Sequence, residues 1–191
     1  PTATTIPPTC VVLEPGKNAG TDAYLKQDNV DDRKGDDSEM RIKTEVEKLQ
    51  RPLTRFDLSS IPPTASVQSM TLSLWVKDLK GPAVDVYAHR VLESWNEAEV
   101  TWADRDRELG LAWATAGGTY DPLVADAVTI AGEDLWASWD LTGMGADWLA
   151  GSNYGAILGA PVSDPKSEVK FKSNNDGDDE HRPLLEVCYW Q

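Results

Sequence analysis

The stretch Met70–Lys77, with the sequence MTLSLWVK, decides the fold class of this chain. In an extended backbone, alternate side chains point to opposite faces, so Leu72, Leu74 and Val76 share one apolar face. The opposite face carries Thr71, Ser73, Trp75 and Lys77. This period of two predicts a strand of an antiparallel sheet that buries one face and turns the other outward.

Further strands are expected on both sides of this stretch. The alternation is clear in VDVYAHRV and in SEVKFKS, and the strands expected besides Met70–Lys77 are Cys10–Leu13, Met40–Val46, Val84–Val91, Ser167–Ser173 and Leu184–Tyr189. Only Thr142–Leu149 offers a helical signal, and the 14 glycines and 12 prolines favour loops between strands. The pattern predicts an all-β chain with a single antiparallel β-sandwich domain over residues 10–191.

The first nine residues, PTATTIPPT, differ from the rest of the chain. Their prolines fix the backbone and remove hydrogen-bond donors, so this segment is expected to be an extended N-terminal arm or a linker. As an arm it would dock on a neighbouring subunit, with Ile6 as the apolar anchor and with Thr4 and Thr5 bonding a strand edge. As a linker it would only connect the domain to another part of a longer protein.

The charge balance excludes two classes of partner. The chain has a formal net charge of −14, and phosphate binding needs clustered Lys and Arg, so neither nucleic acid nor an anionic membrane surface is expected. The longest apolar runs are far shorter than the roughly 20 residues that span a bilayer. Such an acidic surface is common among soluble proteins and also suits a calcium-binding protein.

The two cysteines, Cys10 and Cys188, lie near the two ends of the chain. The first and last strands of a sandwich are often neighbours, so a disulfide between these cysteines is expected in a secreted domain.

Acidic residues gather in two loops, Asp28–Glu39 and Asn174–Glu180. Neither loop fits an EF-hand, because position 6, which requires glycine, is Arg33 when counted from Asp28 and His181 when counted from Asp176. A calcium site would therefore combine oxygen ligands from separate loops. The alternative is that the acidic side chains are only solvated and bind no metal. The candidate Ca²⁺ ligands are Asp22, Asp28, Asp31, Asp32, Asp36, Asp37, Asp176, Asp178 and Asp179.

The chain resembles the DNRLRE domain family, an extracellular family that includes carbohydrate-binding modules found beside alginate-degrading enzymes. The resemblance rests on five blocks that occur in the family's order, and the first of them is TRFDLSSIPPTASVQSMTLSLWV. The blocks are Thr54–Val76, Val84–Trp102, Ala112–Asp121, Leu135–Leu158 and Phe171–Tyr189. In addition, DAYL at 22–25 resembles the opening strand of the family. It implies a jelly-roll-like β-sandwich, secretion and frequently bound calcium. The acidic stretch Asp28–Glu39 and the two cysteines depart from the family pattern.

Seven of the eight tryptophans divide into three groups. Those in the family-like blocks are expected in the core: Trp95, Trp102, Trp139 and Trp148. Trp75 faces outward and is either a sugar-stacking platform or part of a protein contact. Tyr87 and His89 are expected on the outer face of the next strand, where they would extend the Trp75 surface. Trp113 and Trp136 fit either a core or a surface position.

No motif for catalysis is present. The chain has only two histidines and lacks GxSxG and HExxH motifs. Tyr87, His89 and Arg90 superficially match a polysaccharide lyase, but alternation places His89 and Arg90 on opposite faces. The chain is therefore predicted not to be an enzyme.

Two functions remain for an extracellular or cell-surface domain of this kind. The favoured hypothesis is a calcium-binding structural subunit that self-associates through the arm into a filament, tube or surface layer. The alternative is a carbohydrate-binding module that recognises a polysaccharide, as the family resemblance implies.

Overall fold

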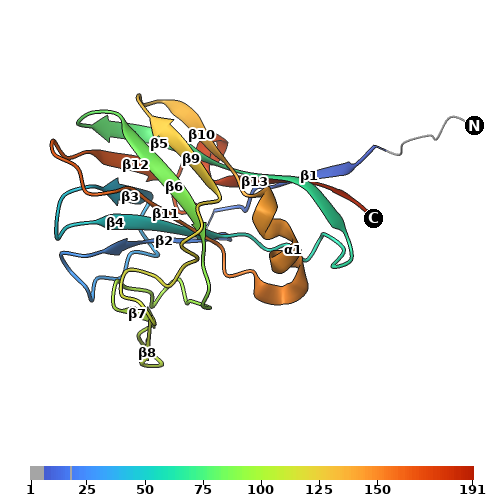
Figure 1. Ribbon diagram of the computed structural model, residues 1–191, viewed down its shortest axis with the longest axis horizontal. Coiled ribbons are helices and arrows are strands. Elements are labelled where there is room, and N and C mark those ends of the chain that lie inside the picture. The colour runs from blue at the N-terminus through green and yellow to red at the C-terminus, as the bar shows by residue number, and fades with distance from the viewer. Residues whose placement is uncertain (1–6, 18) are drawn as a thin grey trace, which may run out of the picture.

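The chain is built almost entirely of antiparallel strands in a computed structural model that describes residues 7–17 and 19–191 (Figure 1). The strands are β1 Thr9–Leu13, β2 Thr21–Lys26, β3 Glu39–Lys43, β4 Gln50–Arg55, β5 Ser66–Lys80, β6 Val84–Arg90, β7 Asp104–Asp106, β8 Leu111–Ala112, β9 Asp126–Ile130, β10 Leu135–Asp140, β11 Ala156–Gly159, β12 Glu168–Lys172 and β13 Leu184–Trp190. The arm residues Thr4, Thr5 and Ile6 lie outside the described residues.

Helical structure is confined to short turns, as the scarcity of helical signal predicts. Three of them follow one another as η1 Thr142–Met144, α1 Gly145–Asp147 and η2 Trp148–Ser152, and η3 Asp179–His181 precedes the last strand. No helix in residues 7–17 and 19–191 is long and apolar enough to cross a membrane.

The described strands form one curled sheet of eleven strands and a separate β7–β8 hairpin. One half of the curled sheet contains β2, β4, β11, β6 and β9, and the other contains β1, β13, β5, β10, β12 and β3. A single residue pair between β3 and β4 joins the halves, which face each other across a common core (Figure 1). The predicted all-β sandwich is confirmed.

Strand β5 organises its half of the sheet because it is 15 residues long and has three partners. Along one edge it pairs with β10 over Thr71–Val76. Along the other edge, β13 pairs with Ser66–Ser73 and β12 pairs with Val76–Lys80. Strands β12 and β13 thus pair with successive parts of the same strand, β5.

The alternation read from MTLSLWVK matches the packing. Leu72, Leu74 and Val76 are fully buried between the two halves of the sheet. From the facing half, Val86 and Ala88 of β6 enter the same core, and Trp139 of β10 donates its indole N–H to the Val86 carbonyl oxygen at 2.9 Å.

A second hydrophobic cluster lies on the outer face of the β2–β4–β11 half. Leu53 and Ile157 contribute from the strands, and Trp95, Trp102 and Trp113 contribute from the long segment between β6 and β9. This half of the sheet is therefore buried on both faces near β2, where the burial pattern no longer alternates. The four tryptophans expected in the core are buried, and so is Trp113, whereas Trp136 is 38% exposed.

The expected continuity between Trp75 and the pair Tyr87 and His89 is wrong. Strand β6 does not pair with β5; it pairs with β11 and β9 in the opposite half of the sheet. Because both strands turn their apolar faces into the shared core, their outer faces look in opposite directions. Trp75 and Tyr87 therefore belong to two separate surfaces.

The predicted disulfide between Cys10 and Cys188 is confirmed. The two residues are directly opposite in the β1–β13 ladder. The bond ties the first described strand to the last one and closes a loop with a sequence separation of 178 residues.

Removing this bond should lower the free energy of unfolding. In the chain-entropy model, a closed loop of this length stabilises the fold by up to about 5 kcal/mol, because it restricts the unfolded chain. We expect the double substitution Cys10→Ser and Cys188→Ser to lower the urea midpoint without changing the native circular dichroism spectrum. An unchanged midpoint would show that the disulfide does not stabilise the fold.

Candidate functional site

A groove of about 380 Å³ opens on the outer face of β6 and β11. Its walls are rich in aromatic and aliphatic side chains and carry a single arginine. The lining residues are Leu49, Arg51, Tyr87, His89, Tyr120, Val124, Ile157, Leu158, Gly159, Ala160, Pro161 and Val162. Clefts of this size, mostly apolar with a few fixed polar groups, are typical of small-ligand sites.

The β6–β11 ladder sets the floor of the groove. Tyr87 is paired with Gly159 and His89 with Ile157. No atom lies within 4 Å of the place where a Cβ of Gly159 would stand, so the groove stays open beside the Tyr87 ring because this position has no side chain.

The polar atoms of Tyr87, His89 and Tyr120 are partly free to meet a ligand. His89 places Nδ1 2.9 Å from the Asp121 carbonyl oxygen, which only accepts, so Nδ1 carries the proton and Nε2 remains an acceptor. The Tyr120 ring lies 4.9 Å from the His89 ring. Among the described residues, the hydroxyl groups of Tyr87 and Tyr120 have no hydrogen-bond partner.

Arg51 brings a positive charge to this groove. Its Nη1 donates to the Gly117 carbonyl oxygen at 2.7 Å, and its guanidinium lies 4.9 Å from the Trp102 ring and 5.5 Å from the Tyr120 ring. Burial lowers its pKa, which Tyr120 partly offsets, but a guanidinium remains protonated in proteins. Within the described part of the chain it forms no ion pair with a carboxylate.

Trp75 lies in a different aromatic cluster, on the opposite surface. Its ring is 5.5 Å from the Trp136 ring at an interplanar angle of 80°, and 3.8 Å from the His181 ring at 45°. The Trp75 and Trp136 rings are nearly perpendicular, so they form no common plane, and the His181 ring lies against Trp75. The cluster is therefore a poor platform for stacking a sugar ring, which needs an open aromatic plane.

Most of the predicted calcium ligands are engaged by cations or donors instead. Asp31 pairs with Arg107 at 2.7 Å, Asp32 pairs with Lys26 at 2.9 Å, and Asp37 accepts from the Tyr24 hydroxyl at 3.0 Å. Asp28 and Asp36 are exposed. In residues 7–17 and 19–191, no group of three His, Cys, Asp or Glu side chains is arranged to hold a metal.

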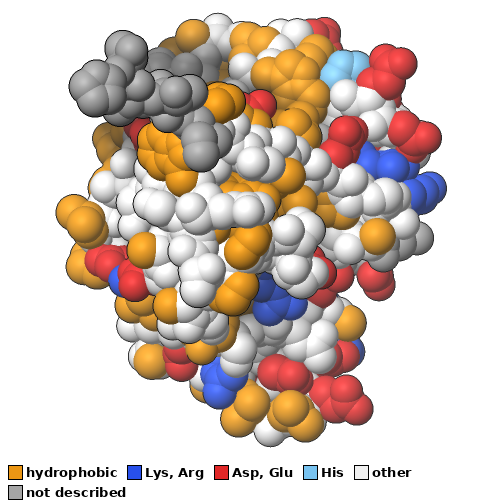
Figure 2. Space-filling view, turned by 90° about the vertical axis from the view of Figure 1, so that its right-hand side faces the viewer, with side chains coloured by type: hydrophobic (Ala, Val, Ile, Leu, Met, Phe, Trp, Pro, Cys, Tyr) orange, Lys and Arg blue, Asp and Glu red, His pale blue; other side chains and the backbone are white. Residues whose placement is uncertain are grey.

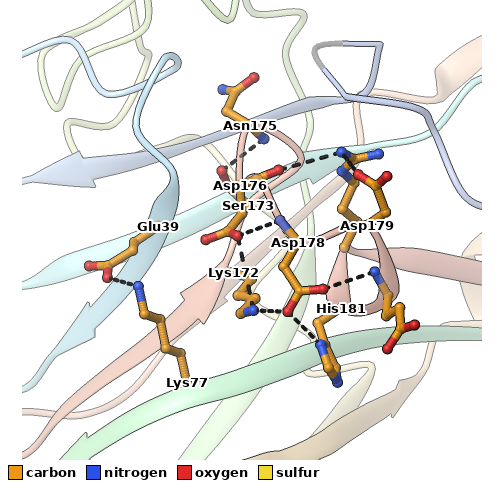
Figure 3. A network of polar contacts seen from close by, with 11 residues as sticks. Glu39, Lys77, Lys172, Ser173, Asn175, Asp176, Asp178, Asp179 and His181 are labelled. Carbon is orange, nitrogen blue, oxygen red and sulfur yellow. Dashed lines mark hydrogen bonds and ion pairs between the residues drawn. The ribbon is translucent and has the colours of Figure 1, made fainter.

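The C-terminal acidic loop is neutralised in the same way. Asp178 contacts both Lys172 and His181, Asp176 lies 4.0 Å from Lys172, and Asp179 contacts Arg182 (Figure 3). Acidic side chains still stand out along the edge of the molecule in Figure 2, in keeping with the net charge of −14. Asp22 differs from the other predicted ligands, because it is buried in β2 and has no cationic partner within residues 7–17 and 19–191.

Glu39 shows how strongly these cations hold a carboxylate. Its oxygens lie 2.6 Å from Lys77, 3.2 Å from Arg41 and 3.8 Å from Lys170. Burial alone would raise the pKa of Glu39, but the three cations, with Lys77 foremost, outweigh it and lower the pKa.

A family model described as carbohydrate-binding module family 96 matches residues 16–188, which is nearly the whole chain. Modules of this kind bind carbohydrate and are not catalytic. A search of curated proteins gave no match.

Replacing Glu39 should give a pH-dependent loss of stability. A lowered pKa means that the contribution of Glu39 is present above its unfolded pKa and is lost as the pH falls through the folded pKa. We expect Glu39→Gln to cost about 0.5–1 kcal/mol at pH 7 and almost nothing at the lowest pH at which the protein still folds. Urea unfolding at a series of pH values measures this, and a constant difference would mean that packing rather than charge is lost.

Proposed function

Since this chain belongs to carbohydrate-binding module family 96, we propose that it is a non-catalytic module that holds a polysaccharide in the groove beside Tyr87 and His89. The observation that carries this proposal is the concave surface in which three aromatic rings and one guanidinium without a carboxylate partner converge. The open plane of an aromatic ring stacks on the apolar face of a sugar, and the free hydroxyl and imidazole atoms suit sugar hydroxyl groups.

The composition of the groove favours binding over hydrolysis. A glycosidase flanks the scissile bond with two carboxyl groups, one of which acts as acid. None of the residues that line the groove is Asp or Glu. The groove therefore offers recognition without the groups that a glycosidase uses.

The resemblance to the DNRLRE domain family and an extracellular location form part of this proposal. The disulfide between Cys10 and Cys188 supports the location, because such bonds form and persist mainly in oxidising compartments.

Self-association is a second candidate function, favoured by the position of β1. This strand is at the end of the sheet, and among the described strands it pairs only with β13, so that no described strand covers its other edge. Its side chain Val12 is 55% exposed. An extended segment of a second chain would find unpaired backbone groups there, as in strand addition to a sheet edge.

Glycan binding should depend on Tyr87. We expect Tyr87→Ala to weaken binding to the recognised polysaccharide about tenfold, which corresponds to ~1.4 kcal/mol. Gly159→Val should weaken it at least as much, since the added side chain would fill the groove. Affinity electrophoresis over a panel of neutral and acidic polysaccharides, followed by calorimetry on the best ligand, measures both effects.

Trp136→Ala is the matched control, because it removes an exposed aromatic ring from the opposite surface. Its affinity should equal that of the unaltered protein. The reverse outcome, with binding lost in Trp136→Ala and kept in Tyr87→Ala, would move the glycan site to the Trp75 cluster.

Self-association should require the first residues of the chain. We expect deletion of Pro1–Pro8 to leave a folded protein with the Cys10–Cys188 bond intact and to shift any assembly to monomer. Light scattering measures the mass of both proteins. If the full chain and the truncated chain form identical particles, residues 1–9 are only a linker.

A further inference from the structure

A second hollow of about 370 Å³, the Trp148 pocket, opens where the helical turns after β10 lie beside the loop between β4 and β5 (Figure 1). Its lining residues are Asp57, Leu58, Ser59, Ile61, Pro63, Trp148, Leu149 and Asn153. None of these residues lines the groove beside Tyr87. The pocket is nearly as large as that groove, so it has room for a ligand of its own.

Two buried polar atoms in the walls of the Trp148 pocket have no hydrogen-bond partner. Trp148 is 3% exposed, and its Nε1 donates to no acceptor within the described residues. Asn153 donates from Nδ2 to the Phe56 carbonyl oxygen at 2.8 Å, whereas its Oδ1 accepts no bond from a described donor. A buried donor and a buried acceptor without partners cost free energy, so this pair points to a group from outside the protein.

Other buried tryptophans do not share this condition. The indoles of Trp95, Trp113 and Trp139 each donate to a backbone carbonyl oxygen, at 2.8, 3.0 and 2.9 Å. The fold therefore satisfies an indole N–H where the indole only fills the core. The unpaired N–H of Trp148 occurs at the tryptophan that lines a pocket.

The charge of the Trp148 pocket disfavours acidic ligands. Ser59 donates its backbone N–H and its hydroxyl to the Asp57 carboxylate at 2.9 and 3.0 Å, and both bonds lower the pKa of Asp57. Asp57 is therefore an exposed carboxylate at neutral pH. Among the described residues that line the pocket, none is Lys or Arg. Such a carboxylate repels an anion and accepts a hydrogen bond from a neutral hydroxyl group.

We propose that the Trp148 pocket binds a neutral sugar residue, at a site separate from the groove. The side chains of Leu58, Ile61 and Leu149 suit the apolar face of a pyranose ring. A sugar hydroxyl group both donates and accepts, which matches the unpaired Trp148 N–H and the unpaired Asn153 Oδ1. A protein with both sites can hold two glycan chains, or one chain at two points with a gain in avidity.

Nuclear magnetic resonance of the whole isotope-labelled chain tests the site. The probes are the neutral methyl glycosides of glucose, mannose and galactose, with sodium glucuronate as the acidic counterpart. At least one neutral glycoside should move the Trp148 indole N–H signal downfield, with a roughly millimolar dissociation constant for a ligand of this size. Glucuronate should bind roughly threefold more weakly, because it meets the Asp57 carboxylate.

Three variants separate this pocket from the groove, with the backbone amides of Ser59 and Asn153 as reporters of affinity. Trp148→Phe keeps an aromatic ring but removes the N–H, and it should weaken glycoside binding about tenfold. Trp95→Phe is the matched control, because the Trp95 N–H already has a partner, and its affinity should equal that of the unaltered protein. Tyr87→Ala should also bind the glycoside unchanged, even if it loses the polysaccharide.

Two results would overturn the proposal. The first is that none of the neutral glycosides moves the Trp148 signal. The second is binding that Tyr87→Ala abolishes and Trp148→Phe keeps, because the sugar then lies in the groove. If Trp148→Phe fails to fold, Asp57→Arg decides at an exposed position: glucuronate should then bind more tightly than the neutral glycoside, and an unchanged preference would place the sugar elsewhere.

Discussion

The apolar face of β5 is the constraint on which the rest of this structure depends. Leu72, Leu74 and Val76 must be covered, and the curled sheet covers them by bringing β6 and β11 across the core. Burial of this face is worth on the order of 1.5–3 kcal/mol for each large side chain. The chain therefore crosses from one half of the sandwich to the other at the short turn after β5, and the outer face of β6 looks away from the outer face of β5.

The groove follows from that crossing and from the long segment between β6 and β9. Trp95, Trp102 and Trp113 cover one part of the outer face of the β2–β4–β11 half and leave the part beside β6 uncovered. Arg51 lies at the boundary between the covered and the uncovered part. Its guanidinium lies over the Trp102 ring, and the same residue lines the groove. The same segment thus builds a second core and one wall of the candidate glycan site.

Charge is distributed in two different ways in this acidic chain. Near the surface, Glu39 is held by two lysines and an arginine, and Asp178 is held by Lys172 and His181. Beside β2, the buried Asp22 has no cationic partner among the described residues, and burial raises its pKa to about 7.

The sequence by itself determined the approximate positions of β1, β3, β5, β6, β12 and β13, the apolar face of β5 and β6, four tryptophans of the core and the pairing of Cys10 with Cys188. It did not mark β4, β9, β10 or β11 as strands. The strands follow from the local period of two, the disulfide follows from the position of the first and last strands, and the core tryptophans were expected from the family resemblance. It also placed Tyr87 and His89 on an outer face, although not on the surface that carries Trp75. Only the tertiary structure decided which outer faces share a surface, because strand neighbours are set by hydrogen bonds between distant segments. For the same reason, Asp22 is separated by 75 residues from Glu97 and by 152 residues from Asn174, and no spacing in the sequence marks them as partners.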